Sequence, residues 1–282
     1  MNYDYEFDVK DLFTNSNNMA DYVRTNPDGY RNYLTIAANC DKYSVSNQLL
    51  IHGFGGGKKP AYLDDYSNWI KNGFTIKEDA TIIHILEKDS NVKEGYKDRM
   101  LVDVTDTNAQ YQPIVYDKGI VLEALMTSSP CKIEFNPEIT SKATYVPNKQ
   151  IIEVSRGYKN IEQIFERLSM EMVHAAIHLG SLEHNKGKDD IKMQYPRSKY
   201  NFLAYSVSYM LASKYDMKPD QIEIKALPPE WKSTSYGNFD MSNSGRAFKN
   251  DVLKPLNDAF KQIDGILSNQ IKSMYHQTGS EL

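Results

Sequence analysis

Cysteine is scarce in this chain of 282 residues, which contains only Cys40 and Cys131. The two lie far apart, without a Cys-x-x-Cys spacing or a cluster of cysteines and histidines, which fits reduced, structural thiols better than a disulfide framework or a zinc knuckle. Long apolar runs are missing as well, since the longest, such as residues 81–86, have the length of a strand. A segment that spans a bilayer needs about 20 apolar residues, so no membrane span is expected.

Signals for export and an excess of positive charge are also lacking. The first ten residues contain no apolar core of a signal peptide, so we expect a cytoplasmic protein. The chain has 33 Lys+Arg and 37 Asp+Glu, for a net charge of −4, and residues 1–110 hold 12 of the basic and 17 of the acidic side chains. Because a protein that neutralises phosphates usually shows a basic face, the acidic first part argues mildly against a nucleic-acid role there.

Residue periodicity predicts helices and short strands in the first part of the chain. A turn at residues 26–29 leads into apolar side chains at helical spacing from Tyr30 to Ala38. Further helices are expected at residues 46–51 and 64–71. Clusters of β-branched residues predict strands at 81–87 and 100–106, which a charged stretch separates. The pattern indicates a compact α+β unit.

The second part of the chain combines short strands with long helices. The expected elements are a helix at residues 119–126, strands at 131–135 and 151–155, and helices at 160–179, 198–215 and 248–273. A polar loop rich in lysine and aspartate is expected at residues 184–193. The α+β class therefore describes both parts, and the length of the chain fits one large domain or two.

A glycine-rich run covers residues 53–60 and contains Lys58 and Lys59. Backbone N–H groups in such a loop can cradle a phosphate, with a following lysine near the outer oxygens. The spacing does not fit a P-loop, because His52 stands where the first glycine is required and Lys59 where the magnesium-binding Ser or Thr is required. We expect a flexible surface loop and no nucleotide.

The predicted helix at residues 160–179 carries Met170, His174 and His178 at intervals of four, with Glu171 beside them. Zinc peptidases use H-E-x-x-H because two histidines one turn apart reach one metal ion while the glutamate activates the bound water. A thioether is a poor zinc ligand, so Met170 leaves only half of the pair. Taken alone, the pattern also fits an apolar helix with two incidental histidines.

Several other stretches accompany this helix and suggest a family. They are residues 43–51 (Tyr-Ser-Val-Ser-Asn-Gln-Leu-Leu-Ile), 66–73 (Tyr-Ser-Asn-Trp-Ile-Lys-Asn-Gly), 82–86, 102–107, 145–154 and 203–209. In their order and spacing the chain resembles the ArdC-like antirestriction proteins of plasmids, phages and integrative elements, including the LtrC-type proteins. The resemblance implies a small α+β single-stranded-DNA-binding domain, residues 1–112, and a zincin-like metallopeptidase domain of long helices and a small sheet, residues 113–275. By the same resemblance the second domain is of the ImmA/IrrE type, and residues 276–282 are a tail.

The zinc ligands that the resemblance implies are only partly present. Met170 replaces the first ligand and Tyr205 the third, while the second ligand, His174, and the general base, Glu171, remain. A catalytic zinc site needs three protein ligands and an open position, so a single imidazole should not hold the ion. We expect a degenerate, non-enzymatic zincin without a cofactor, in which the Tyr205 hydroxyl is hydrogen-bonded to His174.

A shifted zinc site is the alternative to a lost one. His174 and His178 are themselves one helical turn apart and could combine with Glu183 or His184. The metal would then lie about one turn away from Glu171, which weakens this alternative.

Single-stranded nucleic acid is bound by aromatic side chains that stack on bases and by cations along the backbone. In the first domain the candidate platforms are tyrosines and a tryptophan, the candidate cations are lysines, and one amide is a candidate polar contact. They are Tyr43, Tyr62, Tyr66, Trp69, Lys58, Lys59, Lys71, Lys77 and Asn47. The alternative for each aromatic residue is packing in or beside the core.

Three functions are compatible with these patterns. The leading hypothesis is a non-enzymatic, ArdC-like protein of a mobile element that binds single-stranded DNA and, by the resemblance, protects transferring DNA from host restriction. The second is a protein-interaction module whose inactive zincin groove binds a host protein, which the acidic first part favours. The third is an active zinc metallopeptidase with a rearranged site.

Overall fold

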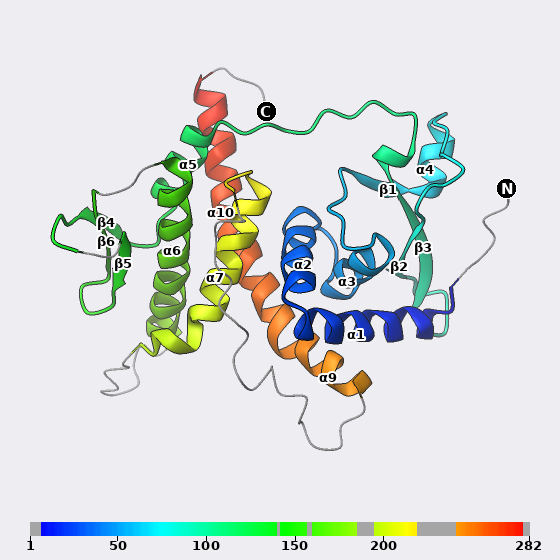
Figure 1. The fold of residues 1–282 in the computed structure, drawn as a ribbon, viewed down its shortest axis with the longest axis horizontal. Helices are drawn as coiled ribbons and strands as arrows, with labels where there is room; N and C mark the ends of the chain where they lie inside the picture. Colours follow the sequence, from blue (N-terminus) through cyan, green and yellow to red (C-terminus); the bar gives the residue numbers. More distant parts are fainter. Residues whose placement is uncertain (1–6, 140–141, 157–159, 185–194, 219–240, 279–282) are drawn as a thin grey trace. The chain divides into compact units, whose positions relative to one another are not determined.

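Helices and two small sheets make up the fold, which confirms the predicted α+β class. The computed structural model describes residues 7–139, 142–156, 160–184, 195–218 and 241–278 (Figure 1). The chain divides into two units, residues 1–113 with 227–257 and residues 114–226 with 258–282. None of the helices within the described ranges is long and apolar enough to cross a lipid bilayer.

The first unit joins short helices to an antiparallel sheet. Its helices are α1 (Val9–Thr25), α2 (Pro27–Asn39), α3 (Val45–Phe54) and α4 (Tyr66–Lys71). Its strands are β1 (Leu63–Asp65), β2 (Ile83–Lys88) and β3 (Tyr96–Asp103), in the order β1-β3-β2. The expected strand at residues 100–106 ends early, because a 3-10 turn follows from Val104 to Asp106.

Helix α1 has no counterpart among the predicted elements. Its buried face is formed by Leu12, Ser16, Ala20 and Val23, which recur at helical spacing. Three asparagines between residues 15 and 18 obscure this pattern, because asparagine is a weak helix former. Packing of the buried face against α2, α3 and the sheet therefore outweighs the local preference.

Asn47 closes the outer edge of β2. Its side-chain amide donates to the carbonyl of Leu86 at 2.9 Å and accepts from the Leu86 N–H at 3.0 Å. These two bonds take the place of a further strand, and they fix α3 against the sheet. The core of the unit lies between these elements and includes Leu12, Ile36, Leu50, Ile51, Leu63, Ile83, Ile85 and Leu101.

Residues 241–257 cluster with the first unit, although the sequence analysis assigned them to the domain at 113–275. Helix α9 (Met241–Phe248) packs along α1, as Figure 1 also shows. The two backbones approach so closely that a Cβ at Gly245 would lie 2.0 Å from the carbonyl oxygen of Asn17. Ser244 donates to Asp21 at 2.7 Å beside this contact. No break in the composition of the sequence indicates that residues 241–257 pack with the first unit.

The part of the second unit that the structure describes contains a mixed sheet and three long helices. Helix α5 (Lys118–Thr127) precedes strands β4 (Lys132–Phe135), β5 (Ala143–Val146) and β6 (Ile151–Val154), in the order β4-β6-β5. Strand β4 is parallel to β6, and β5 is antiparallel to it. The helices are α6 (Ile161–His184), α7 (Arg197–Lys214) and α10 (Lys254–Thr278), whose residues from 258 onward belong to this unit.

Polar contacts join the long helices of this unit. Ser169 of α6 and Ser208 of α7 lie 2.6 Å apart through their hydroxyls, which lets the helices pack closely. Asp264 of α10 accepts hydrogen bonds from Tyr215 at 2.8 Å and from Lys214 at 2.7 Å. The expected loop at residues 184–193 lies outside the described residues, apart from His184 at the end of α6.

We predict that Gly245→Ala lowers the free energy of unfolding by about 1–3 kcal/mol, because the added methyl group forces α9 away from α1. The matched control is Gly265→Ala in α10, where no atom lies within 4 Å of the added Cβ. This control should be stabilising by about 1 kcal/mol, since alanine is the better helix former. Chemical denaturation of both variants measures the difference, and equal effects at the two positions would contradict the close α1–α9 contact.

Candidate functional site

Helix α6 presents a row of polar side chains to the interior of the second unit. Glu171 is 1% exposed, His174 0% and His178 6%. Their spacing places them on one side of the helix, where β5 and the start of α7 pack against it. A buried carboxylate and two buried imidazoles require partners, and the neighbouring elements supply them.

Glu171 is held by a guanidinium. Arg197, the first residue of α7, donates through Nη1 to Oε2 at 2.8 Å and through Nη2 to Oε1. The backbone N–H of Tyr145 in β5 donates to Oε2 at 2.7 Å. A bidentate arginine–carboxylate pair of this kind is among the strongest charge-assisted contacts in proteins. The carboxylate therefore accepts three hydrogen bonds and joins α6, α7 and β5.

The Nδ1 atom of His174 is hydrogen-bonded to the hydroxyl of Tyr195 at 2.7 Å, and the tautomer of the imidazole decides which of the two donates. Burial, followed by the positive charge of Arg197, lowers the pKa of His174 to about 3, and the side chain of Asn201 offsets part of this effect. Its buried Nε2 atom has no partner of good hydrogen-bond geometry among the described residues. The imidazole is therefore neutral at physiological pH.

His178 is paired in the same way with a second tyrosine. The hydroxyl of Tyr145 lies 2.9 Å from its Nδ1 atom, and burial lowers the pKa of the imidazole. The expected bond between Tyr205 and His174 is wrong, because the hydroxyl at His174 belongs to Tyr195, which precedes α7. Tyr195 also stacks on Tyr200, with ring centroids 5.6 Å apart.

These residues do not fit a zinc ion. Met170 is 5% exposed, and it places a thioether at the first ligand position that the family resemblance implies. Within the described ranges no group of three or more His, Cys, Asp and Glu side chains lies close enough to hold a metal. A guanidinium already contacts Glu171. Glu183 and His184, the partners of the shifted site, lie outside the residues whose side chains the structure describes.

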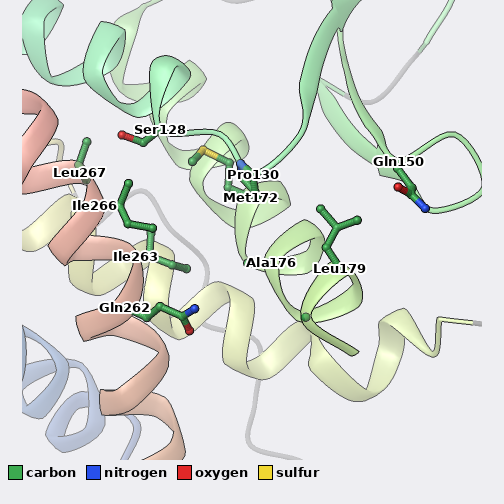
Figure 2. Close-up of a pocket in the computed structure, with 11 residues that line it drawn as sticks. Ser128, Pro130, Gln150, Met172, Ala176, Leu179, Gln262, Ile263, Ile266 and Leu267 are labelled. Atoms are coloured by element: carbon green, nitrogen blue, oxygen red, sulfur yellow. The ribbon is translucent and has the colours of Figure 1, made fainter. Parts of the chain in front are cut away.

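A separate pocket of about 540 Å³ borders the opposite side of α6. Figure 2 shows Met172 and Leu179 of α6 on one wall and Ile263 and Ile266 of α10 on another. Ile266 is 54% exposed, so this wall is an apolar surface open to solvent. Among the described residues that line the pocket none has an ionisable side chain, which fits binding of an apolar group better than catalysis.

Two of the predicted nucleic-acid contacts belong to the framework of the first unit. Trp69 is 6% exposed, and its indole N–H donates to the carbonyl of Val102 at 3.1 Å. The amide of Asn47 is engaged with Leu86 at the edge of β2. These placements argue against the predicted stacking by Trp69 and the predicted polar contact of Asn47, and they agree with the alternative of core packing. Tyr66 is half-buried and packs against the cluster of Trp69, Val102 and Val104.

The remaining predicted tyrosines lie around a lysine. The ammonium of Lys42 is 5.1 Å from the ring centroid of Tyr43 and 5.6 Å from that of Tyr62. Tyr62 is 45% exposed and stacks on Tyr111, which is 41% exposed, at 6.2 Å. We call Lys42, Tyr43, Tyr62 and Tyr111 the tyrosine surface. Sequence reasoning missed Lys42 and Tyr111, because only the folded chain brings them to the other two.

The predicted lysines are all exposed, as are many lysines of the chain. Lys58 and Lys59 lie in the glycine-rich run, Lys71 ends α4, and Lys77 donates to the carbonyl of Thr105 at 2.6 Å. Their exposure is compatible with contacts to phosphates, although it is equally the ordinary position of a lysine.

Similarity to known proteins is found among solved structures. No protein-family model and no curated protein matches the chain. The metal-free crystal structure of the antirestriction protein ArdC from plasmid R388 is similar, with 18% identity over 82% of this chain and 86% of that chain, at a TM-score of 0.43. The Mn(II)-bound structure of the same protein has 14% identity over 81% and 89% of the two chains, at a TM-score of 0.49.

We predict that Arg197→Met alone destabilises the second unit by about 3–5 kcal/mol, because it leaves the carboxylate of Glu171 buried and unpaired. The double variant Glu171→Leu/Arg197→Met should recover most of this loss, since neither charge remains. Denaturant unfolding of Glu171→Leu, Arg197→Met and the double variant completes a double-mutant cycle. A harmless Arg197→Met substitution would show that the pair does not hold the site.

The neutral state of His174 makes stability depend on pH. The unfolded chain binds a proton at the ordinary pKa of 6.5, whereas the folded imidazole binds one only near pH 3, so stability present above pH 6.5 is lost as the pH falls toward 3. The loss approaches about 1.4 kcal/mol per pH unit for one group. His174→Gln should flatten this dependence between pH 6 and 4, while the exposed control His276→Gln should not. Identical profiles for all three proteins would contradict the buried neutral imidazole.

Proposed function

We propose that this chain is a non-enzymatic, ArdC-like antirestriction protein of a mobile element, and that it acts in the cytoplasm by binding single-stranded DNA. Binding of the transferring strand would protect it from host restriction. The ordered family motifs in both parts of the sequence support the assignment. The single observation that carries the non-enzymatic part is the ion pair between Glu171 and Arg197.

The ion pair supports a lost peptidase activity for an electrostatic reason. A general base must have a free lone pair near the water that it deprotonates. In Glu171 one oxygen accepts from both Arg197 and Tyr145, and the other accepts from Arg197. A rearranged zinc peptidase draws no support from the described residues, because they supply no set of three ligands.

Strand binding is supported by the tyrosine surface. Exposed rings offer stacking faces that accept any base, which suits binding without sequence preference. Tyr62 and Tyr111 are both exposed, and Lys42 lies over the neighbouring rings as a cation for the backbone. The exposed lysines Lys58, Lys59, Lys71 and Lys77 would add charge to this surface.

We predict that the purified protein binds a labelled single-stranded oligonucleotide at 50 mM salt and more weakly at 200 mM, as measured by fluorescence anisotropy. Tyr62→Ala should weaken binding at both salt concentrations, because it removes a stacking face. The control is Tyr22→Ala, which removes another exposed tyrosine, 45% exposed, from α1. A well-folded protein that binds no strand at low salt would overturn the proposal.

A second candidate function is binding of an apolar segment of a host protein in the pocket beside α6. The exposed side chain of Ile266 favours it, as do the described lining residues, none of which is ionisable. Ile266→Glu would then abolish an interaction with a host protein and leave strand binding unchanged. The converse pattern, with strand binding lost and partner binding kept, would contradict this division of roles.

A further inference from the structure

The first unit contains a pocket lined by cations, although residues 1–110 carry an excess of acidic side chains. The cavity measures about 790 Å³ and is bordered by Lys88, Arg246, Lys249 and Lys254, and none of the described residues that line it is a carboxylate. Residues 1–110, which form most of the unit, carry 12 basic and 17 acidic side chains. Three of the four cations therefore come from the distant segment 241–257, which α9 and α1 bring into this unit.

A π-helical turn arranges these three cations. It runs from Lys249 to Leu253, between α9 and α10, and the N–H of Lys254 donates to the carbonyl of Lys249. This i→i+5 bond closes one wide turn between Lys249 and Lys254, while Arg246 lies one turn earlier along α9. Single π turns within helices occur frequently at functional sites, because they reorient side chains. The turn here directs three positive charges to one cavity.

Lys249 is the buried member of the group. It is 6% exposed, and its ammonium donates to Asn17 at 2.7 Å and to Ser16 at 3.3 Å, both of them neutral acceptors on α1. Burial, followed by the charges of Lys254 and Arg246, lowers the pKa of Lys249 to about 8. The group is thus charged at neutral pH and repelled by its neighbours. An anion in the cavity would relieve this repulsion.

The other partly buried cations of the unit differ in their pairing. Arg99 pairs with Asp65 and Glu87, and Arg24 pairs with Asp21. None of the four pocket cations forms an ion pair with a carboxylate of the residues that the structure describes. A structural role would favour paired charges, whereas unpaired cations around a cavity are the arrangement of a binding site for anions.

We propose that this pocket binds phosphate groups. Its shape adds to the charge, since Phe13 and Tyr96 form an edge-to-face pair beside the cations, with centroids 5.4 Å apart. Phe13 is 36% exposed, so one ring offers a face on which the base of the same nucleotide can stack. The phosphates belong either to the backbone of a single strand, which rests on the function proposed above, or to a free nucleotide.

The test compares two double variants with the same loss of charge. Arg246→Gln/Lys254→Gln removes two exposed pocket cations and keeps the buried Lys249, so the fold should survive. The control, Lys10→Gln/Lys93→Gln, removes two exposed lysines of the same unit outside the pocket. Circular dichroism checks folding. The probes are a labelled oligothymidylate and, in a separate calorimetric titration, deoxyadenosine monophosphate.

We expect the pocket variant to bind the oligonucleotide about tenfold more weakly than the control at 50 mM salt, with a salt dependence shallower by roughly 0.7 for each lost phosphate contact. If the wild-type protein binds the strand and both variants bind it equally, the pocket inference is wrong and the proposed function stands. If the strand does not bind but the monophosphate binds only when the pocket is intact, the pocket is a nucleotide site and the proposed function fails. Binding of neither probe overturns both.

Discussion

The carboxylate of Glu171 is almost completely buried, and a buried charge without a partner is among the most destabilising features that a protein can contain. Arg197 supplies the partner and thereby fixes where α7 begins relative to α6. The N–H of Tyr145 attaches β5 to the same carboxylate. Three elements of the second unit consequently meet at one side chain, and the tyrosines that contact His174 and His178 are placed by the same arrangement.

The same interaction gives this polar centre a chemistry different from that of a zinc site. A zinc ion would supply positive charge and an acidified water, whereas a guanidinium supplies charge alone. Arg197 remains protonated throughout the physiological range, so the carboxylate of Glu171 is permanently engaged. The unit therefore has the long helices and small sheet that the family resemblance implies, while its polar centre is organised as a structural ion pair.

Charge in the first unit is organised by long-range packing. Its N-terminal residues are acidic, and the segment 241–257 returns to it with Arg246, Lys249 and Lys254. The return depends on the glycine contact of α9 with α1, where no larger residue fits. The net charge of residues 1–110 alone therefore understates the positive charge of this unit, because the added cations are distant in sequence and close in space.

Periodic patterns in the sequence were sufficient to predict α2, α3, β2, the end of β3, β4, β6 and the polar row of α6, because each depends on neighbouring residues. They also placed Met170, Glu171 and His174 on one helix. They predicted no strand at β1 or β5. The partners Arg197 and Tyr195 were missed, since no spacing rule connects them to α6. Trp69, a candidate stacking platform, lies in the core, because an aromatic residue in a motif has no sequence signal that separates a stacking face from a core position.

Glu171 and its neighbours form an ion-paired centre, and we propose that this centre does not hold zinc. Equilibrium dialysis of the purified protein against Zn²⁺ at neutral pH, followed by elemental analysis, tests it directly. We expect the wild-type protein and His174→Ala to retain the same small amount of zinc. Stoichiometric zinc in the wild-type protein that disappears in His174→Ala would contradict it.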